Sequence, residues 1–290
     1  MRGKTVVITG ATSGIGLEAA VALARMGAQV ILVGRNAART AAALARVREA
    51  AGSVPADSLL CDFSSQASIR KLAGELRGRC ERIDVLINNV GGVSRERTLT
   101  TDGVETTFAV NHLGYFLLTN LLLDLLIKSA PARIVNLASV AHYRGTMDLD
   151  DPGFGRGGYQ IMRAYSRSKL ANVLFTRELA RRLAGTGVTV NALHPGTVAT
   201  NIWSAAPGWT RPLLAVFKLF MRSSREGGQR IVYLASSPEV QNTTGAYFED
   251  DRAKEPSRLA QSDDLAARLW SESARLVGLP RTREGAASPG

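Results

Sequence analysis

The sequence predicts an α/β fold in which a single doubly wound parallel sheet of about seven strands carries helices on both faces. The first observation is a series of short runs rich in Val, Ile and Leu, and the second is that helical patterns separate most of these runs. Short apolar strands that alternate with helices are typical of βαβ units, whose parallel strands are buried on both faces. The strand candidates are residues 4–9, 28–34, 57–61, 83–88, 132–139, 188–194 and 244–248.

The length of the chain fits one domain. A chain of 290 residues is long enough for a single large α/β domain with a full core, and it need not form two domains. No change of composition, Ser/Gly linker or internal repeat divides it before residue 281. We therefore predict one domain over residues 1–280, followed by a disordered tail over residues 281–290, which are small and polar.

The first strand leads into a glycine-rich turn and then into a helical stretch over residues 17–26. This arrangement brings backbone N–H groups and a helix N-terminus towards a pyrophosphate. Gly10 would allow the tight turn, Gly14 the close approach of a phosphate, and Gly16 the close packing of helix on strand. A glycine-rich turn that binds no ligand is the alternative. The predicted cofactor-binding residues of this turn are Gly10, Thr12, Ser13, Gly14, Ile15 and Gly16.

The end of the second strand indicates which dinucleotide would bind. An acidic residue there binds the ribose 2′-hydroxyl of NAD, whereas a basic residue suits the 2′-phosphate of NADP. This strand runs into Gly34-Arg35-Asn36, without an acid in reach, and Arg35 can pair with a phosphate in a bidentate way. Arg35 stacked over the adenine, which would permit either cofactor, is the alternative. We predict that NADP(H) is preferred over NAD(H), with Arg35 and Asn36 among its contacts.

A long helix is predicted over residues 159–183, which are rich in Ala, Leu, Arg and Glu and contain neither Gly nor Pro. Tyr165 and Lys169 are four residues apart in this helix, so their side chains share one face. A nearby cation lowers a tyrosine pKa from its reference of about 10, which would make Tyr165 a general acid/base. A chance spacing is the alternative when the pair is taken alone.

Together these segments and four others resemble the short-chain dehydrogenase/reductase family over residues 3–280. The family's motifs occur in the expected order, as Thr9-Gly10-x-x-x-Gly14-x-Gly16, Asn88-Asn89-Val90-Gly91, Asn111, Ser139, Tyr165-x-x-x-Lys169 and His194-Pro195-Gly196-Thr197-Val198. Val90 is a departure, because the family usually has Ala there. The resemblance implies a Rossmann-like fold and the transfer of a hydride between a nicotinamide and a carbon that carries oxygen.

The resemblance also implies the roles of individual residues. Tyr165 would be the general acid/base, Lys169 would lower its pKa and bind the nicotinamide ribose, and Ser139 would donate to the substrate oxygen. Asn111 would hold a water that links Lys169 to solvent. A solvent-facing serine, an Asn cap and a buried polar Tyr are the alternatives. The remaining cofactor contacts that it implies are Asp62, Phe63, Asn89, Val90, Gly91, Pro195, Gly196, Val198 and Thr200. For Asp62 the competing explanation is an N-cap of the next helix.

The substrate is indicated by two variable segments. Tyr165 follows Ser139 by 26 residues, about twice the usual interval of the family, and the insertion lies beside the active site. Residues 200–225 match a lid over the substrate, and their aromatic and aliphatic content, including Trp203, favours an apolar substrate body. An interfacial helix that dips into a membrane surface is the alternative, and the two are not exclusive.

The chain looks most like the retinol dehydrogenase and WW-domain oxidoreductase branch of the family, without its membrane anchor. We therefore predict an NADP(H)-dependent oxidoreductase for a lipophilic ketone, aldehyde or secondary alcohol, and by family analogy a homo-dimer or homo-tetramer. A non-redox member of the fold, such as an epimerase or dehydratase with a tightly held cofactor, is one alternative. A dinucleotide-sensing scaffold is another.

Charge and cysteine usage bear on partners and compartment. The net charge is +11 and the pI is near 10.2, which invites a nucleic-acid interpretation. However, the arginines are scattered, and no recognition helix, zinc-ligand spacing or basic tail occurs, so we expect neither nucleic acid nor metal as a ligand. Cys61 and Cys80 have no disulfide-framework spacing, and we see no signal peptide and no run near the roughly 20 apolar residues of a membrane span. A cytoplasmic location is the expectation.

Overall fold

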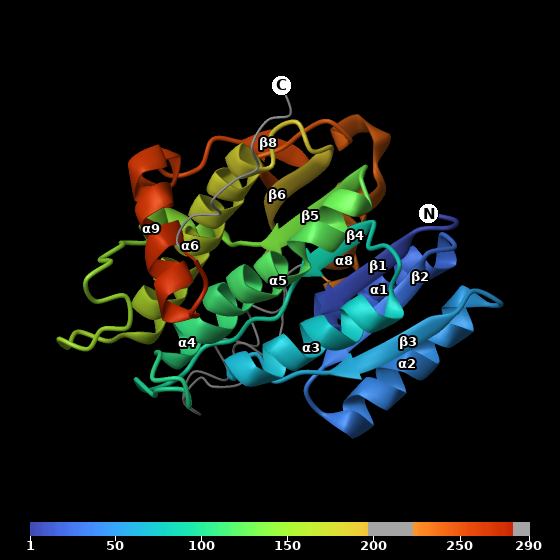
Figure 1. The fold of residues 1–290 in the computed structure, drawn as a ribbon, viewed down its shortest axis with the longest axis horizontal. Helices are drawn as coiled ribbons and strands as arrows, with labels where there is room; N and C mark the ends of the chain where they lie inside the picture. The colour runs from blue at the N-terminus through green and yellow to red at the C-terminus, as the bar shows by residue number, and fades with distance from the viewer. Residues whose placement is uncertain (197–222, 281–290) are drawn as a thin grey trace.

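The computed structural model describes residues 1–196 and 223–280, which form a central sheet between two layers of helices (Figure 1). The strands are β1 (Thr5–Thr9), β2 (Gln29–Gly34), β3 (Ala56–Leu60), β4 (Val85–Asn88), β5 (Ala132–Leu137), β6 (Val188–His194), β7 (Tyr247–Glu249) and β8 (Arg252–Lys254). Across the sheet they follow the order β3-β2-β1-β4-β5-β6-β7-β8. Neighbours from β3 to β7 pair in parallel. This is the order of a Rossmann-like doubly wound sheet, so the predicted fold class is confirmed.

Within residues 1–196 and 223–280 the sheet has eight strands, where about seven were predicted. The additional strand is β8, which pairs antiparallel with β7. Asp250 and Asp251 form the turn between them, with φ values of 51° and 59°. All three residues of β8 are exposed, and this strand has no apolar run that could mark it in the sequence. The predicted strand over residues 244–248 corresponds to β7, which begins later, at Tyr247.

Helices connect the strands and cover both faces of the sheet. The α-helices are α1 (Gly14–Arg25), α2 (Ala37–Ala51), α3 (Gln66–Arg79), α4 (Thr106–Phe108), α5 (Gly114–Lys128), α6 (Ile161–Arg182), α8 (Ser224–Ser236) and α9 (Asp263–Leu276). Between them lie the π-helical turn η1 (Ala109–Leu113) and the short 3₁₀-helices η2 (Val140–Arg144), η5 (Pro238–Val240) and η6 (Arg258–Gln261). The long helix predicted over residues 159–183 is confirmed as α6, with ends that differ by one or two residues.

Two hydrophobic cores lie on opposite faces of the sheet, because successive strand residues point to opposite sides. In β1, Val6 and Ile8 belong to the core beneath α1, α2 and α8. Val7 belongs to the other core, which α3, α5, α6 and α9 cover. Figure 1 shows α3, α5 and α6 side by side on this second face, with α9 against α6. Both faces of the central strands are therefore buried, as their continuous apolar sequences predict.

One stretch in the described part of the chain, residues 106–128, is long and apolar enough to cross a membrane. The sequence predicted no such stretch, because no uninterrupted apolar run approaches about 20 residues. Its most apolar window is 67% buried inside the protein. Phe116, Leu117 and Leu122 of α5 are completely enclosed in the core that also contains α3 and α6. We interpret the stretch as a core helix.

The parallel strands end at one edge of the sheet, and this edge carries the segments singled out in the sequence. Register pairs near the strand ends are Ile8 with Ile87, Asn88 with Asn136, and Leu137 with Leu193. The segments that follow β1, β4, β5 and β6 therefore leave the sheet side by side. In a doubly wound sheet, ligands bind at this carboxyl edge, where the strand order reverses.

Candidate active site

The glycine-rich turn ends at a helix N-terminus whose first N–H groups are not capped by a side chain. Ser13 is the N-cap of α1, but its side chain makes no capping hydrogen bond. Helices α2, α3, α8 and α9 are each capped by the side chain of an Asn or Ser, whereas α6, like α1, has no side-chain cap. The first N–H groups of a helix attract anions, because they are aligned dipoles without an intrahelical partner. The start of α1 therefore suits a pyrophosphate.

Asn89 fixes the shape of this turn from the end of β4. Its Nδ2 donates to the main-chain oxygens of Thr9, at 2.8 Å, and of Gly10, at 3.0 Å. A Cβ atom on Gly16 would lie only 2.4 Å from Asn89 Nδ2 and 2.7 Å from the Gly10 oxygen. Glycine is therefore required at position 16, as predicted, although the close packing is against this amide. Asn89 Oδ1 is buried and has no partner in the described protein, which leaves an acceptor for a ligand.

Arg35 stands exposed at the end of β2, beside the turn. Within residues 1–196 and 223–280 it has no hydrogen-bond or ion-pair partner, so its guanidinium can bind an anion. The Asn36 side chain accepts from the main-chain N–H of Arg39 at 3.0 Å and caps α2. A Cβ atom on Gly34 would lie 2.4 Å from Thr12 Cγ2, which places the Thr12 side chain against the end of β2. The structure thus brings the turn and Arg35 together.

Asp62 and Phe63 follow the end of β3. Asp62 Oδ1 accepts from the main-chain N–H and the hydroxyl of Ser64, at 2.9 and 2.8 Å. This is an Asx turn, and the N-cap of α3 is Ser65, so the alternative of Asp62 as an N-cap is wrong. The Phe63 ring is buried in the core, against Gly114.

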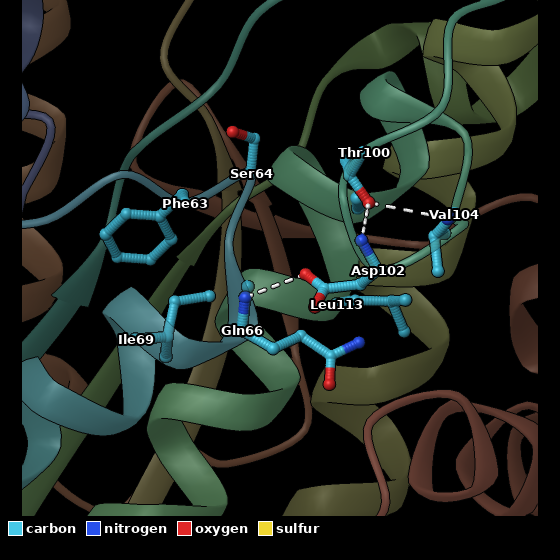
Figure 2. A pocket seen from close by; sticks show the side chains of 10 residues that line it. Phe63, Ser64, Gln66, Ile69, Thr100, Asp102, Val104 and Leu113 are labelled. Carbon is cyan, nitrogen blue, oxygen red and sulfur yellow. Dashed lines mark hydrogen bonds between the residues drawn. The ribbon is translucent and has the colours of Figure 1, made fainter.

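A small pocket lies beside Phe63, and Figure 2 shows the side chains around it. The main-chain N–H of Gln66 donates to Asp102 at 2.9 Å and ties the start of α3 to the loop before α4. The cavity volume is about 10 Å³, the lower limit for one water molecule. It therefore cannot hold a substrate, and it lies apart from Ser139 and Tyr165.

The four predicted catalytic residues come from different elements. Tyr165 and Lys169 lie on α6, Ser139 follows β5, and Asn111 lies in η1. A Cβ atom on Gly91 would lie 3.5 Å from Asn111 Oδ1 and 3.8 Å from Lys169 Nζ, so these side chains meet at the segment after β4. The hydroxyls of Ser139 and Tyr165 are hydrogen-bonded. The structure thus brings all four together at the carboxyl edge of the sheet.

The protonation of the Tyr165–Lys169 pair differs from the expectation. Burial raises the pKa of the Tyr165 hydroxyl above 10, and the hydrogen bond with Ser139 opposes this rise. Burial also lowers the pKa of Lys169 to about 7. Lys169 Nζ donates to the main-chain oxygen of Leu137 at 3.0 Å and lies 5.7 Å from the centroid of the Tyr165 ring. The expected lowering of the Tyr165 pKa by Lys169 is therefore not seen, because both groups are withdrawn from water.

The Asn111 side chain is held through both its oxygen and its nitrogen. Its Oδ1 accepts from the main-chain N–H of Gly92 at 2.9 Å, and its Nδ2 donates to the Gly92 oxygen at 2.9 Å and to Ser168 Oγ at 3.0 Å. The residue lies in a π-helical turn, a rare element that is frequent at functional sites. Asn111 therefore joins the loop after β4 to α6.

Tyr115 is a site residue that no motif in the sequence indicated. Its hydroxyl donates to the main-chain oxygen of Val90 at 2.7 Å, and its ring centroid lies 5.9 Å from Lys169 Nζ. The main-chain N–H of Val90 in turn donates to Thr9 Oγ1 at 3.3 Å. The available signal was the spacing of four residues from Asn111, but a fully buried aromatic residue in an apolar helix resembles ordinary core.

The long segment from residue 140 to 160 is held against α6 by a buried arginine. Arg167 donates to the main-chain oxygens of Thr146 and Asp151, at 3.1 and 2.7 Å. Its guanidinium also lies 3.8 Å from the centroid of the buried Phe154 ring. Arg167 therefore holds the insertion against α6.

Some predicted residues cannot be placed. Pro195 and Gly196 follow β6 at the carboxyl edge, and Gly196 has a φ of 92°. Val198, Thr200, Trp203 and residues 200–222 of the predicted lid lie outside the described residues, as does the tail over residues 281–290.

Comparisons with known proteins point in the same direction as this geometry. Residues 4–210 match the family model described as short chain dehydrogenase. Retinol dehydrogenase 13 from Homo sapiens is 45% identical over 289 residues, which cover 97% of this chain and 87% of that protein.

Solved structures resemble most of the chain as well. A crystal structure of an uncharacterized protein from Mycobacterium paratuberculosis superposes with a TM-score of 0.79 at 33% identity, covering 97% of this chain and 96% of that one. The RhlG/NADP active-site complex of Pseudomonas aeruginosa has a TM-score of 0.69 at 27% identity, covering 86% of this chain and 94% of that one.

Proposed function

The chain belongs to the short chain dehydrogenase family, as an oxidoreductase similar to retinol dehydrogenases, and we propose that it is an NADP(H)-dependent enzyme for lipophilic ketones, aldehydes or secondary alcohols. One observation carries the proposal. The Ser139–Tyr165 hydrogen bond, Lys169 Nζ and the Asn111 amide all lie at the carboxyl edge of the sheet. At the same edge α1 begins, without a side-chain cap. Such an edge combines a proton donor with an anion site.

The residues fit a dinucleotide along this edge. The start of α1 would hold the pyrophosphate, and Asn89 Oδ1 supplies a buried acceptor that has no partner in the described protein. Arg35 would bind the 2′-phosphate, and Asp62 would contact the adenine. The cofactor that is bound in the RhlG neighbour is also NADP. We therefore propose NADP(H) as the preferred cofactor.

Reduction of a carbonyl needs one proton on the substrate oxygen. When it is bound, the nicotinamide supplies the hydride that the carbonyl carbon accepts. Tyr165 gives its hydroxyl proton to the carbonyl oxygen, and its raised pKa keeps that proton in place at neutral pH until it is needed. Ser139 donates to the same oxygen as negative charge develops. Lys169 would bind the ribose hydroxyls near Gly91, where its Nζ lies.

Apolar side chains beside the proton donor support a lipophilic substrate. Val140 follows Ser139 directly and is 41% exposed. Ile161 and Met162 are 36% and 47% exposed, and they precede Tyr165 by four and three residues on α6. Residues at these spacings share a helix face, so both lie on the Tyr165 side of the helix. Exposed apolar groups around a proton donor favour an apolar substrate body.

The function is tested with the purified chain, NADPH or NADH, and a panel of carbonyls that includes retinaldehyde, long-chain aldehydes, bulky apolar ketones and hydrophilic sugar aldehydes. We expect NADPH oxidation with the apolar members. Turnover with the sugar aldehydes alone would contradict the proposed substrate class. Stoichiometric NADP that survives purification, without net turnover of added NADPH, would instead support a non-redox enzyme.

The cofactor preference is tested with Arg35→Asp. A charge-assisted bidentate contact is worth about 1.5–3 kcal/mol, so we expect the NADPH dissociation constant to rise by about 10- to 100-fold. The NADH dissociation constant should change less than about threefold, because NADH lacks the 2′-phosphate. Fluorescence titration of both cofactors gives the two values. Arg252→Asp makes the same charge change on the exposed β8 and should alter neither. Equal losses for NADPH and NADH would contradict the role of Arg35.

A further inference from the structure

A buried chain of polar side chains connects Lys169 to the C-terminal helix α9. Asn172, three residues after Lys169, donates through Nδ2 to the main-chain oxygens of Asn111 and Leu137, both at 3.0 Å. The Leu137 oxygen is the same atom that accepts from Lys169 Nζ at 3.0 Å. His112 continues the chain, with Nδ1 at 3.4 Å from Asn172 Oδ1.

This series of hydrogen-bonded side chains ends on α9. His112 Nε2 lies 2.9 Å from the hydroxyl oxygen of Ser273. His112, Asn172 and Ser273 are completely enclosed in the protein, and Lys169 is nearly so. Buried polar groups of this kind are costly unless each one has a partner, so a continuous chain that satisfies all of them is a specific arrangement.

The two main-chain oxygens beside Asn172 fix the direction of the hydrogen bonds between Asn172, His112 and Ser273. Asn172 faces two main-chain oxygens, so its NH₂ group must point towards them and its Oδ1 towards His112. His112 must then carry a proton on Nδ1, and its Nε2 must accept from Ser273. Burial lowers the pKa of His112 to about 3, so the ring is neutral at pH 7.

We propose that Asn172, oriented by His112, is a positioning residue that fixes Lys169 and the π-helical turn of Asn111 from behind the active site. Asn172 gives the Leu137 oxygen its second donor, so the position of that oxygen does not depend on the lysine alone. It also holds the Asn111 oxygen, and with it the turn that presents the Asn111 side chain to Gly92. Ser273 extends this support to α9. Only the expected change in kcat rests on the proposed function.

Aromatic rings surround His112, so its replacements can distinguish a side chain that only fills space from one that orients Asn172. Its ring centroid lies 5.0 Å from that of Phe108, 6.4 Å from that of Phe116 and 6.1 Å from that of Phe175. If His112 only filled space, Leu or Phe would replace it better than the smaller, polar Asn. If it orients Asn172, then Asn is the better replacement, because its amide N–H can take the place of Nδ1–H.

We therefore compare His112→Asn, His112→Leu and His112→Phe with the wild type. We expect His112→Leu and His112→Phe to lower kcat by about 10- to 100-fold, with the dissociation constant of NADPH within about threefold. Amide hydrogen exchange over residues 109–114 should become about tenfold faster in both. His112→Asn should stay within about threefold of the wild type in kcat and in exchange. These magnitudes correspond to the loss of one or two buried hydrogen bonds.

Two further variants distinguish a general loss of stability from a loss of positioning at the active site. Asn191→Leu removes another buried amide, which bridges the main chain of Thr243 and Ala246, and should lower the thermal midpoint without changing kcat or exchange over residues 109–114. Ser273→Ala is a smaller change. It should lower kcat and speed amide hydrogen exchange over residues 109–114, each by about threefold.

The outcomes separate the two proposals. Retained kcat and exchange in His112→Leu, or a better result with His112→Phe than with His112→Asn, would overturn the positioning role. A wild type that turns over no carbonyl would overturn the proposed function alone, because hydrogen exchange over residues 109–114 would still report on the positioning role.

Discussion

Tyr165→Phe is expected to lower kcat by about 100- to 10,000-fold, while the dissociation constant of NADPH stays within about threefold of the wild type. The phenyl ring fills the same space, so cofactor contacts and packing are kept. What is lost is the proton that the substrate oxygen must receive, and general acid catalysis contributes about 10²- to 10⁴-fold. Steady-state kinetics with the best carbonyl of the panel and fluorescence titration with NADPH measure the two quantities.

Tyr233→Phe is the matched control for this substitution. Its hydroxyl hydrogen-bonds with Glu239 at 2.9 Å on α8, so its removal should leave kcat unchanged. A Tyr165→Phe enzyme within about tenfold of the wild-type rate would show that another group supplies the proton. Ser139 would then be the first candidate, because it is hydrogen-bonded to Tyr165.

The parts of the site that the sequence predicted well are those set by local pattern. The ends of α6 fall within two residues of the predicted ends, because an uninterrupted run of helix-forming residues defines them. The glycine-rich turn from Gly10 to Gly16 was predicted to lead into a helix, and α1 begins at Gly14; its phosphate contacts stay a prediction. In both cases one short segment contains all the information.

What the sequence could not show depends on segments that are far apart in the chain. The amide of Asn89 reaches back to Thr9 and Gly10, about 80 residues earlier, and this contact explains why Gly16 must be glycine. The raised pKa of Tyr165 follows from how tertiary packing excludes water, and a spacing of four residues contains no such information. Long-range contacts of this kind appear only when the sheet places its carboxyl ends together.

The contact at Gly16 leads to the second large prediction, that Gly16→Ala raises the NADPH dissociation constant by at least about 100-fold. The new Cβ would lie 2.4 Å from Asn89 Nδ2 and 2.7 Å from the Gly10 oxygen, so either Asn89 or the start of α1 must move. If the amide moves, the turn loses the bonds to Thr9 and Gly10 that shape it. Overpacking of this kind also costs about 1–3 kcal/mol of unfolding free energy.

Gly74→Ala separates the local clash from the general effect of alanine in a helix. Gly74 is an exposed glycine inside α3, and a Cβ there would meet no atom within 4 Å. Alanine should therefore stabilise the protein by about 0.5–1 kcal/mol and leave NADPH binding unchanged. Urea unfolding and fluorescence titration, applied to both variants, measure the two effects. Wild-type NADPH affinity in Gly16→Ala would mean that the cofactor does not approach the α1 N-terminus, because no displaced turn could keep its phosphate contacts.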